Sequence, residues 1–290
     1  MTTDPPSPRR KWHLQRWLLL LAAGFLAYGG WTQYAFRAAL KEARALGWAV
    51  YYTDPYEVIR ADWKAAFRKA TWLDGVTGVD IPTSEEFEQH LAILHRLNPK
   101  ELRIMDASTL RDIPKLNGIS RLQSVVLIDC TRLTNLDGLK DLSALQKLVL
   151  HGCKALTNVD ALKSHSALKM IELPECRALT NVDALKNLSA LERLDLSGSG
   201  LTNVDALKHL GALKSLDLRG CTELINVDGL GNLAALQSLS LGFCTRLTNV
   251  DVIKSLPALH EVWLTACTGL PPDNITALRA VMLKTRIYTD

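Results

Sequence analysis

The 290-residue sequence has few of the features that enzymes share. It has no glycine-rich phosphate loop, no Gly-x-Ser-x-Gly nucleophile motif and no His-Glu-x-x-His zinc motif. Its seven histidines are scattered, and no two of its six cysteines form the Cys-x-x-Cys pair typical of zinc sites. The formal net charge of +4 is small for a protein that binds nucleic acid. We therefore expect no catalytic activity, no metal, no cofactor and no nucleic-acid partner.

Aromatic residues make up only 6% of the sequence, and tryptophan is concentrated near its start. Six of the seven tryptophans precede residue 73, which marks a boundary in composition. Residues 17–36 carry no charge and are bracketed by Arg16 and Arg37. About 20 apolar residues are enough for one membrane crossing, so this stretch predicts a transmembrane helix that follows a basic tail, residues 1–16. A cleaved signal peptide ending near Gly30 is the alternative.

The charges around this stretch also bear on topology. Arg9, Arg10 and Lys11 precede it and favour a cytoplasmic N-terminus, although Lys41 and Arg44 follow it and weaken the asymmetry. We therefore expect a single-pass membrane protein whose remaining residues lie on the extracytoplasmic side.

One repeated block, L-T-N-V-D-A-L-K-x-L-x-A-L-x-x-L-x-L-x-G-C-x-x, dominates the rest of the chain. Its leucines are first three residues apart, which suits 3₁₀ turns, and then two apart, which suits a short strand. A period of this length predicts a solenoid, whose coils bury their apolar edges by stacking. Copies are 23 residues long, except one of 22, and begin at Leu133, Leu156, Leu179, Leu201, Leu224 and Leu247, with a more divergent copy at Leu110.

The strand part of the block, L-Q-K-L-V-L-H-G-C at residues 145–153, matches the L-x-x-L-x-L-x-x-N/C core of leucine-rich repeats. Over residues 110–269 the chain resembles the internalin-like bacterial subtype of that family, in seven copies. The resemblance implies an α/β solenoid with short parallel strands on the concave side and 3₁₀ or turn segments on the convex side. We expect residues 37–83 to form a membrane-proximal α/β segment, and residues 84–109 and 270–290 to cap the two ends.

The capping segments have their own patterns. A helix should end at Gly47, residues 56–73 are amphipathic, and Ser84 should open a helix that runs to residue 97. Residues 273–283 should form a last helix. The expected flanking strands are residues 48–52, 76–81 and 286–288.

Each coil also repeats polar residues and a cysteine. The aspartate of each N-V-D, such as Asp137, should cap the following turn, and the asparagine before it should bond turn backbone. Calcium binding is the weaker reading of the aspartates, because the nonapeptide calcium repeat is absent. The cysteines should be buried free thiols, with disulfides as the alternative. His165 stands where other coils carry leucine, and we expect a tolerated edge residue there.

Outward positions of the strands vary from coil to coil while the framework repeats, which is typical of a recognition surface. An ordinary solvated sheet is the alternative. Three acids on successive strands predict a basic ligand, and Trp263 predicts an apolar anchor. The predicted partner-binding residues on the concave face are Lys147, Val149, Met170, Glu172, Arg193, Asp195, Asp217, Arg219, Ser240 and Trp263.

The sequence thus predicts a membrane-anchored interaction module that binds a protein partner. Two alternatives remain open. One is a structural or self-associating envelope spacer without a specific ligand. The other is an enzyme with its active site within residues 38–83, a segment that is small for a catalytic pocket.

Overall fold

The computed structural model describes residue 35 and residues 37–52 and 76–290. The predicted transmembrane helix, apart from residue 35, and the amphipathic stretch at 56–73 lie outside these residues. Within the described part of the chain, no helix has both the length and the apolar character needed to span a bilayer.

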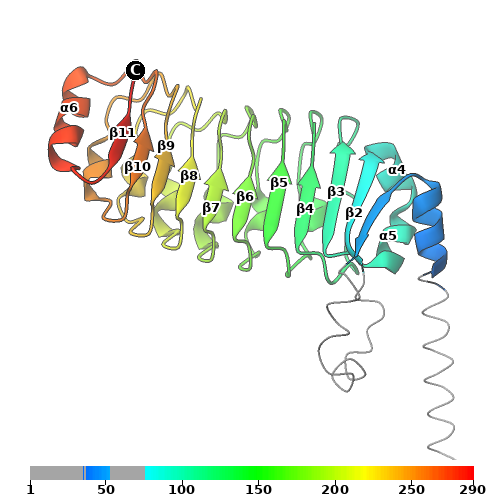
Figure 1. Ribbon diagram of the computed structural model, residues 1–290. Coiled ribbons are helices and arrows are strands. Elements are labelled where there is room, and N and C mark those ends of the chain that lie inside the picture. The colour runs from blue at the N-terminus through cyan, green and yellow to red at the C-terminus, as the bar shows by residue number, and fades with distance from the viewer. Residues whose placement is uncertain (1–34, 36, 53–75) are drawn as a thin grey trace, which may run out of the picture.

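Eleven short strands form a single sheet in which they follow one another in chain order (Figure 1). The first pair, β1 (Ala49–Tyr52) and β2 (Val76–Thr83), is antiparallel, and all later pairs are parallel. The other strands are β3 (Glu101–Asp106), β4 (Ser124–Leu127), β5 (Lys147–Leu150), β6 (Met170–Glu172), β7 (Arg193–Asp195), β8 (Ser215–Asp217), β9 (Ser238–Ser240), β10 (Glu261–Trp263) and β11 (Arg286–Tyr288).

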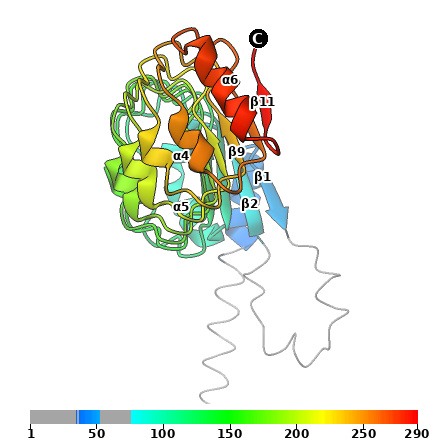
Figure 2. The ribbon, with the colours of Figure 1, turned by 90° about the vertical axis from the view of Figure 1, so that its left-hand side faces the viewer.

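In the six coils from Leu133 onward, a 3₁₀ helix lies on the opposite side of the coil from its strand, as the view along the solenoid shows (Figure 2). The predicted change from a spacing of three to a spacing of two along each copy is therefore confirmed, and with it the parallel solenoid. The 3₁₀ helices are η1 (Asp137–Leu139), η2 (Asp160–Leu162), η3 (Asp183–Asn187), η4 (Asp205–His209), η5 (Asp228–Leu230) and η6 (Asp251–Ser255).

The leucines of the repeat make one continuous core. In the coil that starts at Leu133, the inward side chains of Leu145, Leu148 and Leu150 are all fully buried, and the same positions are buried in the later coils. Burying one leucine side chain stabilises the folded chain by about 1.5–3 kcal/mol. No coil closes this core alone, so stability depends on the stack and on its two ends.

The front end of the stack departs in two details from the expectation. Instead of one helix over residues 84–97, the chain forms α4 (Ser84–Gln89) and α5 (Leu91–Leu97), because His90 leaves the helical region at φ −120°. The N-cap is Thr83, whose hydroxyl accepts from the Glu86 N–H at 3.4 Å. Ser84 instead hydrogen-bonds the Thr109 hydroxyl at 2.6 Å, which ties the helix to the next coil.

The described part of residues 37–83 joins the same sheet through β1 and β2. Residues 37–45 are helical and end in a turn at Gly47, as predicted. Trp48 is buried, and its indole N–H donates to Glu86 of α4 at 2.9 Å. The division of the chain into domains stays a prediction, but strand pairing runs without a break from β1 to β11.

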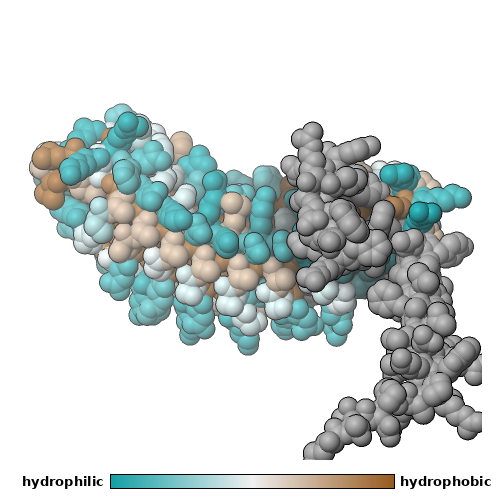
Figure 3. Space-filling view, turned by 60° about the horizontal axis from the view of Figure 1, so that its bottom comes forward, coloured by the Kyte–Doolittle hydropathy of each residue, from teal (hydrophilic) through white to brown (hydrophobic). Residues whose placement is uncertain are grey.

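The back end carries α6 (Pro272–Val281) and then β11, close to the predicted helix and at the predicted strand. Leu278 and Met282 are buried against the last coils, so this segment does cover the core. Its end exposes two apolar side chains, with Val281 64% and Leu283 85% exposed. Figure 3 shows the corresponding hydrophobic patch at the C-terminal end of the solenoid.

The aspartate cap prediction is wrong, and the asparagine prediction is confirmed. No side chain caps the 3₁₀ helices from the N-cap position, and each aspartate is the first helical residue. The asparagine two residues earlier accepts the aspartate N–H, for example Asn135 at 3.0 Å and Asn249 at 2.8 Å. An aspartate in the first turn still favours the helix dipole, and Asp137 also pairs with Lys140 at 2.9 Å.

All six cysteines are buried and free. Three thiols reach back to the preceding coil: Cys221 donates to the Leu196 carbonyl at 3.3 Å, Cys244 to the Leu218 carbonyl at 3.2 Å and Cys267 to the Leu241 carbonyl at 3.0 Å. Burial raises the pKa of Cys244 and of Cys267 above the ordinary value, so both thiols stay protonated. Ser199 fills this position in the 22-residue coil and hydrogen-bonds Cys221 at 3.3 Å.

His165 is no edge residue. Its side chain is fully buried, and the ring Nε2 lies 2.9 Å from the Leu139 carbonyl oxygen of the preceding coil. The ring Nδ1 is buried without a hydrogen-bond partner. The site thus accepts a polar ring by satisfying one of its two nitrogens.

Candidate recognition surface

The outward side chains of β4 to β10, here called the strand face, lie in the rows that the sequence predicts. Strand register sets Val149 beside Glu172, Glu172 beside Asp195, and Asp195 beside Asp217. The same row continues through Ser240 to Trp263. Lys147, Met170 and Arg193 form the adjacent row. Of the ten predicted residues, Arg219 alone lies outside these two rows, just beyond the end of β8.

The acids of the strand face have partners within the protein. Arg193 pairs with Glu172 at 3.1 Å and Arg219 with Asp217 at 2.9 Å. The Asp217 carboxylate raises the pKa of Arg219 through its hydrogen bond and its charge. Asp195 accepts the Ser197 N–H at 2.9 Å; among the described residues no cation pairs with it directly, although its charge contributes to raising the pKa of Arg219. Two of the three acids are therefore already neutralised, and the case for a basic ligand now depends on Asp195.

Trp263 is less open than the sequence suggests. Its ring stacks on Tyr288 of β11, with ring centroids 5.1 Å apart and planes 11° from parallel. The pair lies where the strand face meets the C-terminal cap, and Tyr288 remains 38% exposed. Trp263 thus covers the last coils and offers a partner only part of its surface.

Another column of residues, one per coil, has a left-handed backbone. Each lies directly before the cysteine position, with φ between 56° and 72°. Glycine adopts this conformation without strain, whereas other residues do so at a cost. The column consists of Asp129, Gly152, Glu175, Gly198, Gly220, Phe243 and Ala266.

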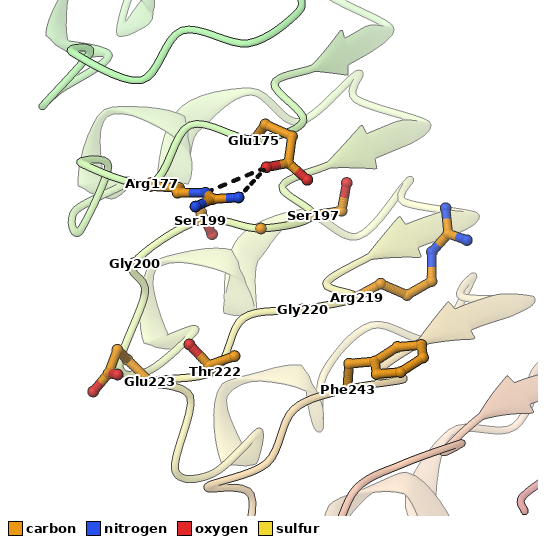
Figure 4. Close-up of a pocket in the computed structure, with 11 residues that line it drawn as sticks. Glu175, Arg177, Ser197, Ser199, Gly200, Arg219, Gly220, Thr222, Glu223 and Phe243 are labelled. Carbon is orange, nitrogen blue, oxygen red and sulfur yellow. Dashed lines mark hydrogen bonds and ion pairs between the residues drawn. The ribbon is translucent and has the colours of Figure 1, made fainter.

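The two central glycines of this column are the floor of a recess of about 660 Å³ at the carboxyl ends of β6 to β9 (Figure 4). Glu175 and Arg177 stand on one side of it, and Arg219 and Phe243 on the other. We call this hollow the glycine recess; its remaining lining residues are Ser197, Gly198, Ser199, Gly200, Gly220, Thr222 and Glu223.

Sequence reasoning missed the glycine recess, although two signs of it were visible. The position before the cysteine is glycine in three of seven coils, which indicates a left-handed backbone. The 22-residue copy also ends there, at Gly200. Of the predicted partner-binding residues, only Arg219 lines the recess.

Two further groups of residues were compared with the structure: possible metal ligands and the lysines of the convex side. Within the described ranges, no three His, Cys, Asp or Glu side chains gather in a way that could hold a metal ion. On the convex side Lys254 pairs with Asp251 at 2.6 Å, as Lys140 does with Asp137. Both lysines therefore pair with the aspartate that opens the 3₁₀ helix of their own coil.

Comparison with known proteins supports the repeat assignment. A family model described as the leucine-rich-repeat domain of the endo-β-N-acetylglucosaminidase EndoS matches residues 113–221, which is less than half of the chain. No curated protein matches the sequence as a relative.

Solved structures share the fold at low sequence identity. Internalin C2 of Listeria monocytogenes is 22% identical, with a TM-score of 0.53 over 69% of this chain and 84% of that one. Internalin InlF of the same organism is 16% identical, with a TM-score of 0.50 over 69% and 65%. TLR13, solved in complex with ssRNA13, is 20% identical with a TM-score of 0.53, and the match spans 74% of this chain but only 33% of TLR13. By its repeats and its solenoid, the chain has the leucine-rich-repeat fold, and internalin structures are among those that share it.

Proposed function

We propose that this protein is a membrane-anchored interaction module that binds a macromolecular partner, a protein, through its strand face. The observation that carries the proposal is the contrast within each strand. Inward positions are leucine or another aliphatic residue in coil after coil, whereas the outward positions aligned by register change from Val149 to Glu172, Asp195, Asp217, Ser240 and Trp263.

The strand face offers both a charged and an aromatic contact for such a partner. Asp195 is the acid with the fewest partners, so a basic group of the partner belongs there. The Trp263–Tyr288 stack supplies a rigid aromatic patch at the end of the same row. Aromatic residues and charged pairs of this kind are enriched among binding hot spots.

The anchor and the location are part of the proposal. They depend on residues 17–36, a charge-free stretch of bilayer-spanning length bracketed by arginines. We propose a single crossing with the repeats on the extracytoplasmic side. We also propose that the protein itself is not catalytic, since the sequence carries none of the enzyme motifs sought in it.

The structural neighbours add a second partner class to test. TLR13 was solved in complex with ssRNA13, so a leucine-rich-repeat chain of this shape can take single-stranded RNA. Arginine-paired acids along the central row of the present strand face disfavour a phosphate backbone. A protein partner is therefore preferred, and a spacer without any ligand is the remaining alternative.

Affinity capture from intact membranes, followed by mass spectrometry, tests the proposal. The full chain should recover a specific protein, and Asp195→Lys or Trp263→Ala should reduce the recovery at least about tenfold. Lys186→Glu on the convex side is the control and should leave recovery unchanged. Loss of capture with the convex variant alone, or recovery of only the chain itself and lipid, would contradict the proposal.

A further inference from the structure

Phe243 occupies a position that costs the fold stability. Its backbone is left-handed at φ 63°, and its side chain is 57% exposed. Glycine takes the equivalent position at Gly152, Gly198 and Gly220. A bulky residue there accepts backbone strain and also leaves more than half of its surface in water. A residue that breaks a local rule at an exposed position is a candidate for a role outside folding.

Phe243 stands at the edge of the glycine recess, whose depth has two causes. The coil ending at Gly200 is one residue shorter than its neighbours, and it lies so close to the coil before it that a Cβ at Gly200 would be 2.6 Å from the Arg177 carbonyl oxygen. Gly198 and Gly220 then leave the floor without side chains. A Cβ at Gly220 would meet nothing nearer than the Gly198 backbone at 3.8 Å, so this floor is open to an approaching chain.

The walls of the recess present unused hydrogen-bond donors. Arg177 directs Nε and Nη2 to Glu175, at 3.3 and 3.0 Å, and Arg219 directs its own Nε and Nη2 to Asp217. Each guanidinium therefore keeps its Nη1 edge for another acceptor, and both side chains are more than half exposed. A carboxylate is the acceptor that complements such an edge best.

We propose that the glycine recess binds an extended segment of a protein partner, which seats a large apolar side chain against Phe243, a neighbouring carboxylate against Arg219 and a more distant acceptor against Arg177. The glycine floor admits the backbone of the segment, and the open walls, which mix polar and apolar groups, suit a peptide better than an enclosed apolar ligand. This inference rests on the proposed function, because it adds a second contact beside the strand face.

Selection from a random peptide library displayed on phage tests the recess without the natural partner. The bait is the full chain in a mild non-ionic detergent. Enriched peptides should share an aromatic or large aliphatic residue next to Asp or Glu. Their affinity should fall at least about tenfold for Phe243→Gly and for Gly220→Asn, which places a side chain in the recess.

Gly152→Asn is the matched control for Gly220→Asn. Gly152 has the same left-handed backbone and lies outside the recess. A Cβ at this position would lie 4.0 Å from the nearest atom, the Cα of Asp129. Peptide affinity should stay within about twofold of that of the unchanged chain. Asp129, at the equivalent position, shows that the fold accommodates a short polar side chain there.

A stability measurement separates a binding role of Phe243 from a structural one. Phe243→Gly should raise the denaturant midpoint, because it relieves backbone strain. A lowered midpoint would overturn the inference, as would an enriched set without an apolar–acidic pattern, or peptides that bind Gly220→Asn as well as the unchanged chain. If Asp195→Lys abolishes partner capture while the recess variants bind both partner and peptides normally, the recess fails and the strand-face function stands.

Discussion

The inward and outward sides of the same strands follow different rules. On β7, Leu194 points inward and is almost fully buried, and leucine or another aliphatic residue takes that position in every coil from β4 to β10. Its neighbours Arg193 and Asp195 point outward, and the equivalent positions range from Lys147 to Trp263. Repetition inside and variation outside teach that the solenoid gains most of its stability from one side of each strand and leaves the residues on the other side free to vary.

The largest expected effect tests this division directly. Leu194→Ala removes a buried side chain from the middle of the stack and should cost about 3 kcal/mol of unfolding free energy. Arg193→Ala, one residue away on the outward side, should change it by about 0.5 kcal/mol or less. Denaturant titration of both variants measures the difference, and equal losses would break the comparison.

Alkaline pH should destabilise the folded chain through its buried cysteine thiols. Burial raises the pKa of Cys221, Cys244 and Cys267 in the folded chain, whereas the unfolded chain titrates near the ordinary value of 9.0. Above about pH 9 the unfolded state therefore releases protons that the folded state keeps, and stability falls by up to about 1.4 kcal/mol per pH unit for each thiol.

A serine variant isolates this effect. Serine already occupies the equivalent position at Ser199, so Cys244→Ser should be tolerated. The variant should lose less unfolding free energy between pH 8 and pH 10, because the contribution of one buried thiol is removed. An unchanged slope would mean that the buried thiols do not set the alkaline limit of stability.

His165→Leu should stabilise the stack by about 1 kcal/mol. The change removes a buried ring nitrogen that lacks a partner and restores the leucine of the neighbouring coils. The Leu139 carbonyl loses the ring but keeps the Leu142 N–H at 3.0 Å. His165→Ala is the control and should destabilise, because it leaves a cavity. A lower denaturant midpoint for the leucine variant would show that the single ring hydrogen bond outweighs both gains.

The smallest effect distinguishes the two repeated polar residues. Asn203 accepts the Asp205 N–H at 3.2 Å, whereas Asp205 caps no backbone group. Asn203→Ala should therefore cost about 1 kcal/mol, and Asp205→Ala only about 0.3 kcal/mol through the helix dipole. The reverse order in thermal melts would restore the aspartate as the cap.

The sequence predicts the solenoid well because its period fixes the register. Once Leu148 faces inward, the pairing of Val149 with Glu172 follows from the spacing of 23 residues. Ion pairs between coils follow the same spacing, as for Glu223 and Arg246 at 2.6 Å, and could have been read from the period. Pairs of residues one repeat apart are therefore the part of the candidate surface that the sequence predicts best.

Other features depend on backbone geometry that the pattern does not encode. The break at His90 and the hydrogen bond that holds the buried His165 ring each follow from where one carbonyl or N–H group lies in the folded coil. The glycine recess depends on two features, the glycines with left-handed backbone and the coil that is one residue shorter. A hollow forms only where these two features lie side by side in the folded chain.

Site-specific photocrosslinking tests the central claim most directly. A photoreactive residue replaces Ser215 on the strand face or Lys208 on the convex side, in the full chain within intact membranes. The account predicts a discrete crosslinked protein from position 215 and none from position 208. A product from position 208 alone, or no product from position 215, would contradict recognition by the strand face.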